Sequence, residues 1–93
     1  MDVPRVGQLV CSHKGRDKGN YYLITEILDE KYVQVANGST RKINQPKKKN
    51  IKHLKLYPHV DDDLGSRLNS GNTSNEKLVR SINRLLQEVE REE

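Results

Sequence analysis

The hydrophobic residues of the first 56 positions gather in short runs that alternate with polar turns, a pattern that predicts five short β-strands. The runs are rich in Val, Ile, Leu and Tyr, which favour strands, and Gly, Asn, Asp and Lys separate them. Asn37-Gly38 lies between two such runs and predicts a two-residue hairpin turn, because that turn needs positive φ at both central residues. The expected strands are residues 6–12, 21–28, 32–36, 39–43 and 51–56, the last with a 3₁₀ turn at its start.

No helical pattern interrupts these strands, so residues 1–58 are predicted to form one small antiparallel barrel. Closing the sheet removes exposed strand edges, which a small protein has difficulty protecting otherwise. Residues 44–50, NQPKKKN, are polar and contain a proline, and we expect them to form a loop. The expected fold class is therefore mainly β.

A polar linker is predicted after the barrel, over residues 59–73. Its composition is Asp, Ser, Gly and Asn with scattered Leu, and its acidic triplet Asp61-Asp62-Asp63 is expected to be solvated. Thr73 and Glu76 then fit a capping box, in which each side chain satisfies a backbone N–H at the start of a helix. A helix is therefore expected to begin at this point.

The helix, residues 74–93, has an apolar stripe at spacings of three and four. The stripe consists of Leu78, Val79, Ile82, Leu85, Leu86 and Val89. A lone helix of this length is only marginally stable, so the stripe must pack on the barrel, on a second copy of the chain or on a partner. The sequence leaves these three alternatives open.

Composition limits the chain to one small domain with an appendage. Of its 93 residues 32% are hydrophobic and 32% charged, and Tyr is the only aromatic residue type, so the core must be thin. No apolar run is long enough to span a membrane or to form a signal peptide, so we expect a cytoplasmic protein without membrane contact. Cys11 is the only cysteine, and together with three His it lacks metal-ligand spacing, so we expect neither a disulfide nor a metal site.

Positive charge is concentrated in the first part of the chain. Residues 1–59 contain 12 Lys and Arg against 5 Asp and Glu, whereas residues 60–93 contain 5 against 8. A basic surface attracts polyanions, and in a chain without a membrane signal the commonest polyanion is nucleic acid. The alternative is that these lysines are only solvated and bind no partner.

Residues 6–29, VGQLVCSHKGRDKGNYYLITEILD, resemble the KOW motif, in which a strand, a basic loop with a glycine and a second strand follow one another. Gly19 occupies the place of the motif's diagnostic glycine. Residues 32–56, especially RKINQPKKKNIKHLKL, are similar to the archaeal and eukaryotic large-subunit ribosomal KOW protein conventionally numbered fourteen, and to small bacterial KOW-domain RNA-binding proteins related to it. The resemblance covers about residues 4–57 and implies a five-stranded SH3-like barrel that binds RNA, commonly ribosomal RNA.

The expected RNA-binding residues combine the positions matched by this resemblance with the other cations of the basic segment. They are Lys14, Arg16, Lys18, Gly19, Arg41, Lys42, Lys47, Lys48, Lys49, Lys52, His53 and Lys55. Contacts from such residues go mainly to phosphates, so recognition of RNA shape is expected. Four Tyr leave little for base stacking. We find no pattern of catalytic residues and expect no cofactor.

The sequence therefore predicts a ribosome-associated RNA-binding protein that is not an enzyme. Its expected partners are ribosomal RNA and, beside it, proteins of the large subunit, with a monomer favoured over a dimer. The alternative is a protein-interaction module that uses the C-terminal helix, and dimerisation through that helix is a third hypothesis.

Overall fold

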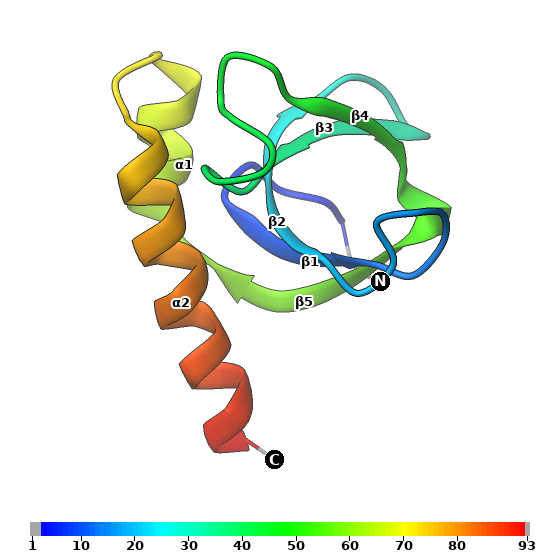
Figure 1. Ribbon diagram of the computed structural model, residues 1–93. Coiled ribbons are helices and arrows are strands. Elements are labelled where there is room, and N and C mark those ends of the chain that lie inside the picture. Colours follow the sequence, from blue (N-terminus) through cyan, green and yellow to red (C-terminus); the bar gives the residue numbers. More distant parts are fainter. Residues whose placement is uncertain (1–2, 93) are drawn as a thin grey trace.

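The computed structural model describes residues 3–92 and contains five strands, one 3₁₀ turn and two helices (Figure 1). In chain order the elements are β1 (Gln8–Ser12), β2 (Tyr21–Ile27), β3 (Tyr32–Ala36), β4 (Lys47–Asn50), the 3₁₀ turn η1 (Ile51–His53), β5 (Leu54–Val60), α1 (Asp62–Asn69) and α2 (Asn75–Glu92). Strands β1, β2 and β3 and the 3₁₀ turn before β5 lie where the sequence predicted them.

The strands form one antiparallel sheet with the order β4-β3-β2-β1-β5. The number of strands and their antiparallel arrangement were predicted correctly, but the prediction of a closed barrel is wrong, because β4 and β5 form the two edges and have no backbone ladder between them. Strand β4 is only four residues long, and η1 follows it at once and turns the chain towards β5. The fold is therefore a mixed α/β fold with an open sheet.

The connection between β3 and β4 also differs from the predicted two-residue hairpin. Residues 39–43 are not a strand, and Lys47–Asn50, expected to be a loop, is strand β4, paired with β3. The Asn37 side chain explains the difference, because its Oδ1 accepts the N–H groups of Ser39 (3.0 Å) and Arg41 (2.9 Å) and folds the segment into a compact loop. Only Gly38 has positive φ here, at +79°, so the type I′ turn does not form.

Successive side chains along a strand point to opposite faces of the sheet, and each face has a hydrophobic core of its own. Val10, Tyr22, Ile24, Val33, Val35 and Leu54 form a cluster that the sheet encloses by itself. On the other face, Leu9, Leu23 and Ala36 are covered by Leu64 of α1 and by Leu78, Ile82 and Leu85 of α2. Figure 1 shows both helices on one side of the sheet. The helices therefore complete the second core.

Helix α1 lies within the segment predicted to be a linker. Asp61 starts it as the N-cap, since its Oδ1 accepts the N–H of Leu64 at 3.0 Å. Gly65 allows α1 to approach the N-terminal segment, because a Cβ there would lie 2.6 Å from the carbonyl oxygen of Val6. The prediction of a linker is thus wrong for residues 62–69, and two helices follow β5 instead of one. Asp62 and Asp63 are exposed to solvent as predicted, whereas Asp61 is largely buried.

Helix α2 begins at Asn75 and confirms the predicted amphipathic helix, although its cap differs. Ser74 Oγ accepts the N–H of Lys77 at 3.4 Å, whereas the Oγ1 atom of Thr73 is buried and has no hydrogen-bond partner among the described residues. The predicted hydrogen bond of the Thr73 side chain in a capping box therefore does not form.

The apolar stripe of α2 packs on the sheet, which is the first of the three alternatives. Leu78, Ile82 and Leu85 are buried, Leu86 and Val89 pack beside them, and Val79 is half-buried. Most of this stripe is consequently occupied within the chain, whereas Val79 lies outside the core cluster. No helix in residues 3–92 is long and apolar enough to cross a membrane.

Candidate nucleic-acid interface

The loop between β1 and β2 is a compact basic projection at one end of the sheet. Two backbone hydrogen bonds hold its base: Gly19 N–H donates to the Ser12 carbonyl (2.8 Å), and Ser12 N–H donates to the Asn20 carbonyl (2.9 Å). Gly19 has φ +92°, and a Cβ at this position would meet nothing within 4 Å. The need for glycine is therefore conformational and does not arise from crowding within the chain.

Asp17, in the middle of this loop, points inward and ties the loop to β1, β2 and β4. Its carboxylate accepts hydrogen bonds from Ser12 Oγ at 3.0 Å, Tyr22 OH at 3.0 Å and Lys49 Nζ at 3.1 Å. Lys47 Nζ lies 3.3 Å away on the outer side. The side chains of Asp17 and Lys49 are only 10% and 8% exposed, so this ion pair is part of the interior.

The environment of Asp17 keeps its carboxylate ionised. Burial by itself would raise its pKa, but the hydrogen bonds from Lys49, Ser12, Tyr22 and Lys47 together outweigh burial and hold the pKa well below its usual range. The negative charge thus neutralises a buried ammonium, and the arrangement serves to position the loop.

The 3₁₀ turn η1 docks against the same loop. The N–H of His13 donates to the carbonyl of His53 at 3.0 Å, and Asn50 caps η1 by accepting the N–H of Lys52 at 2.9 Å. Lys52 in η1 and Lys55 at the start of β5 are exposed. The hydrogen bond between His13 and His53 places both lysines close to the β1–β2 loop.

Two lysines of the edge strands lie over tyrosine rings. Lys48 Nζ is 4.5 Å from the ring centre of Tyr32, and Lys55 Nζ is 4.8 Å from that of Tyr57. These cation–π contacts orient the side chains and leave both lysines exposed. All four Tyr side chains are buried or half-buried, which favours contacts with phosphates over base stacking.

The structure separates the predicted RNA-binding residues into three groups. Exposed residues of the β1–β2 loop, β4, η1 and β5 form the first group, which we call the loop surface: Lys14, Arg16, Lys18, Gly19, Lys48, Lys52 and Lys55. Half-buried His53 and the partly paired Lys47 lie beside it, whereas Lys49 points inward.

Arg41 and Lys42 form a group of their own in the β3–β4 loop. Arg41 donates to the carbonyl of Gln45 (3.4 Å) and Lys42 to that of Gly38 (3.3 Å). This loop is fixed to the start of α2, where Asn75 Oδ1 accepts the N–H of Ile43 at 2.8 Å.

Sequence reasoning did not find the cluster around Asp17. An acidic residue between Arg16 and Lys18, in an otherwise basic loop, was the available signal, but its partners Lys47 and Lys49 come from a distant strand. Within residues 3–92 no group of three or more His, Cys, Asp and Glu side chains is placed to hold a metal ion.

An open antiparallel sheet, two covering helices and a rigid basic loop define the chain as a small basic α/β protein. No family model matches it. It is 34% identical over 64 residues to a protein of Bacillus subtilis (strain 168) named "Putative ribosome-binding protein YbzG", and the match covers 69% of this chain and 86% of that protein. The chain belongs to the same family as that protein. The relative's name describes binding to the ribosome and no reaction.

Proposed function

We propose that this protein binds the ribosome, and that it does so through ribosomal RNA and the loop surface. The relationship to the Bacillus subtilis protein named as a ribosome-binding protein is the observation that carries the proposal. Exposed cations on several anchored segments supply the chemistry, because phosphate groups are the most abundant charge on a ribosome's RNA.

The rigidity of the loop supports a role in recognising RNA shape. Lys14, Arg16 and Lys18 project from a loop held by Asp17 and by the turn at Gly19, so fewer conformations are lost when these side chains bind. Phosphate contacts of this kind fix position and carry little base information. The resemblance to KOW proteins at residues 6–29 favours RNA as the ligand.

The same resemblance favours the large subunit as the binding site, with its ribosomal RNA as the main partner and its proteins as neighbours. In this proposal Lys49 does not contact RNA, because its ammonium is buried with Asp17. Lys48 contributes from the exposed face of β4, and the half-buried Lys47 contributes from the opposite face, beside Asp17. The protein acts without a cofactor and catalyses no reaction.

Co-sedimentation with purified ribosomes at low and high salt tests the proposal. We expect the wild-type protein to move with the large subunit at low salt and to be released as salt rises. The variant Lys18→Gln/Lys52→Gln should bind more weakly. The slope of log K against the logarithm of the salt concentration should also become shallower by about two, since two phosphate contacts are lost.

Arg5→Gln/Arg91→Gln is the matched control, since it removes the same charge from two exposed positions, in the N-terminal segment and in α2, that lie outside the loop surface. If the wild-type protein stays at the top of the gradient at every salt concentration, ribosome binding is refuted. If the loop-surface variant behaves as the control does, the ribosome is bound through another face.

A further inference from the structure

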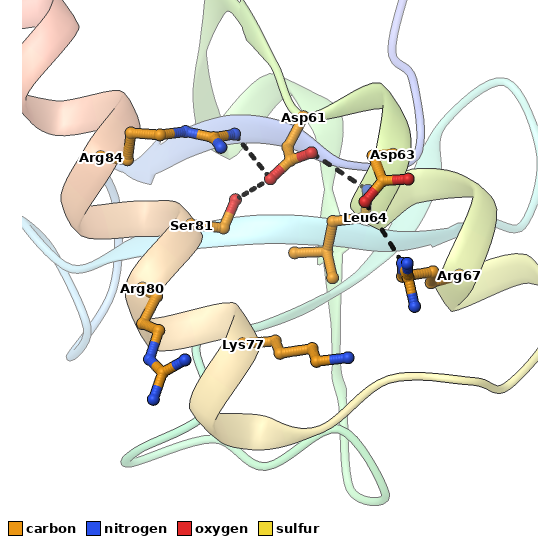
Figure 2. Close-up of a pocket in the computed structure, with 8 residues that line it drawn as sticks. All are labelled: Asp61, Asp63, Leu64, Arg67, Lys77, Arg80, Ser81 and Arg84. Atoms are coloured by element: carbon orange, nitrogen blue, oxygen red, sulfur yellow. Dashed lines mark hydrogen bonds and ion pairs between the residues drawn. The ribbon is translucent and has the colours of Figure 1, made fainter.

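A groove of about 290 Å³ lies between α1 and α2, on the helical side of the molecule (Figure 2). Its walls carry four cations and two carboxylates: Arg67, Lys77, Arg80, Arg84, Asp61 and Asp63. Leu64 is the apolar member of the lining, and it is only 4% exposed because it faces the core. Cations therefore outnumber carboxylates among the charged groups of the groove.

Asp61 contributes little negative charge to this groove, because its carboxylate is fully engaged. Oδ2 accepts hydrogen bonds from Ser81 Oγ at 2.7 Å and from Arg84 at 2.8 Å, while Oδ1 caps α1. The Asp61 side chain is 12% exposed. This ion pair neutralises Arg84 and holds α2 against the start of α1.

Apart from the Asp61–Arg84 pair, the groove is lined by three cations and by one carboxylate, that of Asp63. Arg67 pairs with Asp63 at 3.2 Å, but Asp63 is 83% exposed, and an exposed pair of this kind is weak enough to exchange for another anion. Lys77 and Arg80 have no ion-pair partner among residues 3–92. In Figure 2 Lys77 extends from α2 towards α1, and neither Lys77 nor Arg80 reaches a carboxylate.

We propose that this groove is a second phosphate-binding surface, and that Lys77, Arg80 and Arg67 contact the sugar-phosphate backbone of RNA there. The inference rests on the proposed function, since it takes the same class of ligand. Guanidinium groups match phosphate oxygens in bidentate geometry, and Lys77 adds a mobile point charge. A peptide with apolar side chains would find little to bind here, because Leu64, the apolar member of the lining, is buried in the core.

The groove and the loop surface lie on different sides of the protein. In Figure 1 the helices are on one side of the sheet, and the β1–β2 loop and η1 are on the other. A single phosphate backbone segment that lies along the loop surface therefore does not reach the groove. Two surfaces placed in this way allow the protein to hold two segments of a folded RNA.

A ¹⁵N-labelled protein titrated with a 20-base-pair RNA duplex provides the test, because NMR reports each surface separately. In the wild-type protein we expect shifts of the amides of Lys14 and Gly19 at the loop surface and of Arg67 and Ser81 at the groove. In Lys77→Gln/Arg80→Gln the groove shifts should be lost, while the loop shifts remain. The slope of log K against log salt should fall by about two in that variant.

The control is again Arg5→Gln/Arg91→Gln, which should retain both sets of shifts, and the spectra themselves show whether each variant is folded. Shifts at the loop surface alone in the wild-type protein would overturn the second site and leave the proposed function standing. Absence of shifts at both surfaces would overturn the groove as an RNA site and the assignment of RNA to the loop surface, while co-sedimentation decides ribosome binding itself. Groove shifts with a polyglutamate peptide but not with RNA would assign the groove to an acidic protein and overturn its assignment to RNA.

Discussion

Asp17 and Lys49 form a nearly buried ion pair at 3.1 Å, and this pair connects the β1–β2 loop to the edge strand β4. No backbone ladder joins the two edges of the sheet. A closed barrel would pair β4 with β5, whereas here the side chains of Asp17, Ser12 and Lys49 hold β4 against the end of β1.

Replacement of Asp17 with Asn should destabilise the protein strongly, because the ammonium of Lys49 would stay buried without a countercharge. We expect the free energy of unfolding to fall by about 3 kcal/mol in urea denaturation. Asp17→Asn/Lys49→Met removes the unpaired charge and should recover part of the loss. Asp62→Asn, in an exposed pair with Arg5, should cost less than about 1 kcal/mol. A loss for Asp17→Asn no larger than that for Asp62→Asn would contradict the structural role of the pair.

Stability should decrease in acid, and Asp17 and Asp61 should cause much of the decrease. The pKa of each carboxyl lies below its ordinary value of 3.8 in the folded protein, so the unfolded chain takes up the proton first. The stabilisation is complete above about pH 4 and is lost as the pH falls towards the folded-state pKa, at up to about 1.4 kcal/mol per group and pH unit. Unfolding by circular dichroism between pH 6 and pH 2 measures this slope. Asp17→Asn should flatten it, and an unchanged slope would assign the acid sensitivity to other groups.

Gly38 and Gly19 should respond differently to alanine, although both have positive φ. At Gly19 only the strained backbone matters, and we expect Gly19→Ala to cost about 1–2 kcal/mol. At Gly38 the new Cβ would also lie 2.2 Å from the carbonyl oxygen of Asn75, so α2 or the β3–β4 loop must move. Thermal unfolding should show a clearly larger loss for Gly38→Ala. Equal losses of stability for the two variants would mean that the β3–β4 loop moves away from Asn75 at no cost in free energy.

Helix α2 should be required for folding and not only for binding. Leu78 is fully buried against the sheet, and Leu78→Ala should lower the free energy of unfolding by about 2–5 kcal/mol. The exposed Gln87 on the same helix is the control, and Gln87→Ala should change the free energy by less than about 0.5 kcal/mol. A deletion of residues 73–93 that leaves a cooperatively folded sheet would contradict this conclusion.

The strands with alternating apolar residues were predictable from the sequence, and the two elements that were missed lack that signal. Strand β4 is KKKN, and it forms because it pairs with β3, buries Lys49 beside Asp17 and places Lys48 over Tyr32. These are contacts between distant residues, and a local pattern of lysines gives no indication of them.

Helix α1 was missed for a similar reason. Its sequence contains a glycine and only two apolar residues, Leu64 and Leu68, so it resembles a flexible linker. The helix is stabilised by the cap at Asp61 and by contacts with the rest of the fold, and Gly65 is needed where α1 meets the carbonyl of Val6. Intrinsic propensity, which disfavours glycine within a helix, is overridden here by tertiary packing.

The exposed cations of the candidate site were also predictable, since charge along the sequence locates a basic surface. Their division into the loop surface, the interior and the β3–β4 loop was not predictable, because it depends on which lysine meets Asp17. The pairing of Asp61 with Ser81 and Arg84 likewise depends on how α1 and α2 are arranged.

The burial of Leu9 and Leu23 beneath Leu78 and Leu85 also constrains when the chain can fold during its synthesis. The first strands leave these leucines exposed to water until the segment containing Leu85 has been made, because no earlier element covers the outer face of β1 and β2 completely. Contacts between such distant parts of a chain form slowly, and the incomplete product exposes apolar surface that favours aggregation. Folding of this protein is therefore a late, cooperative event in which the last helix closes the structure around the first strand.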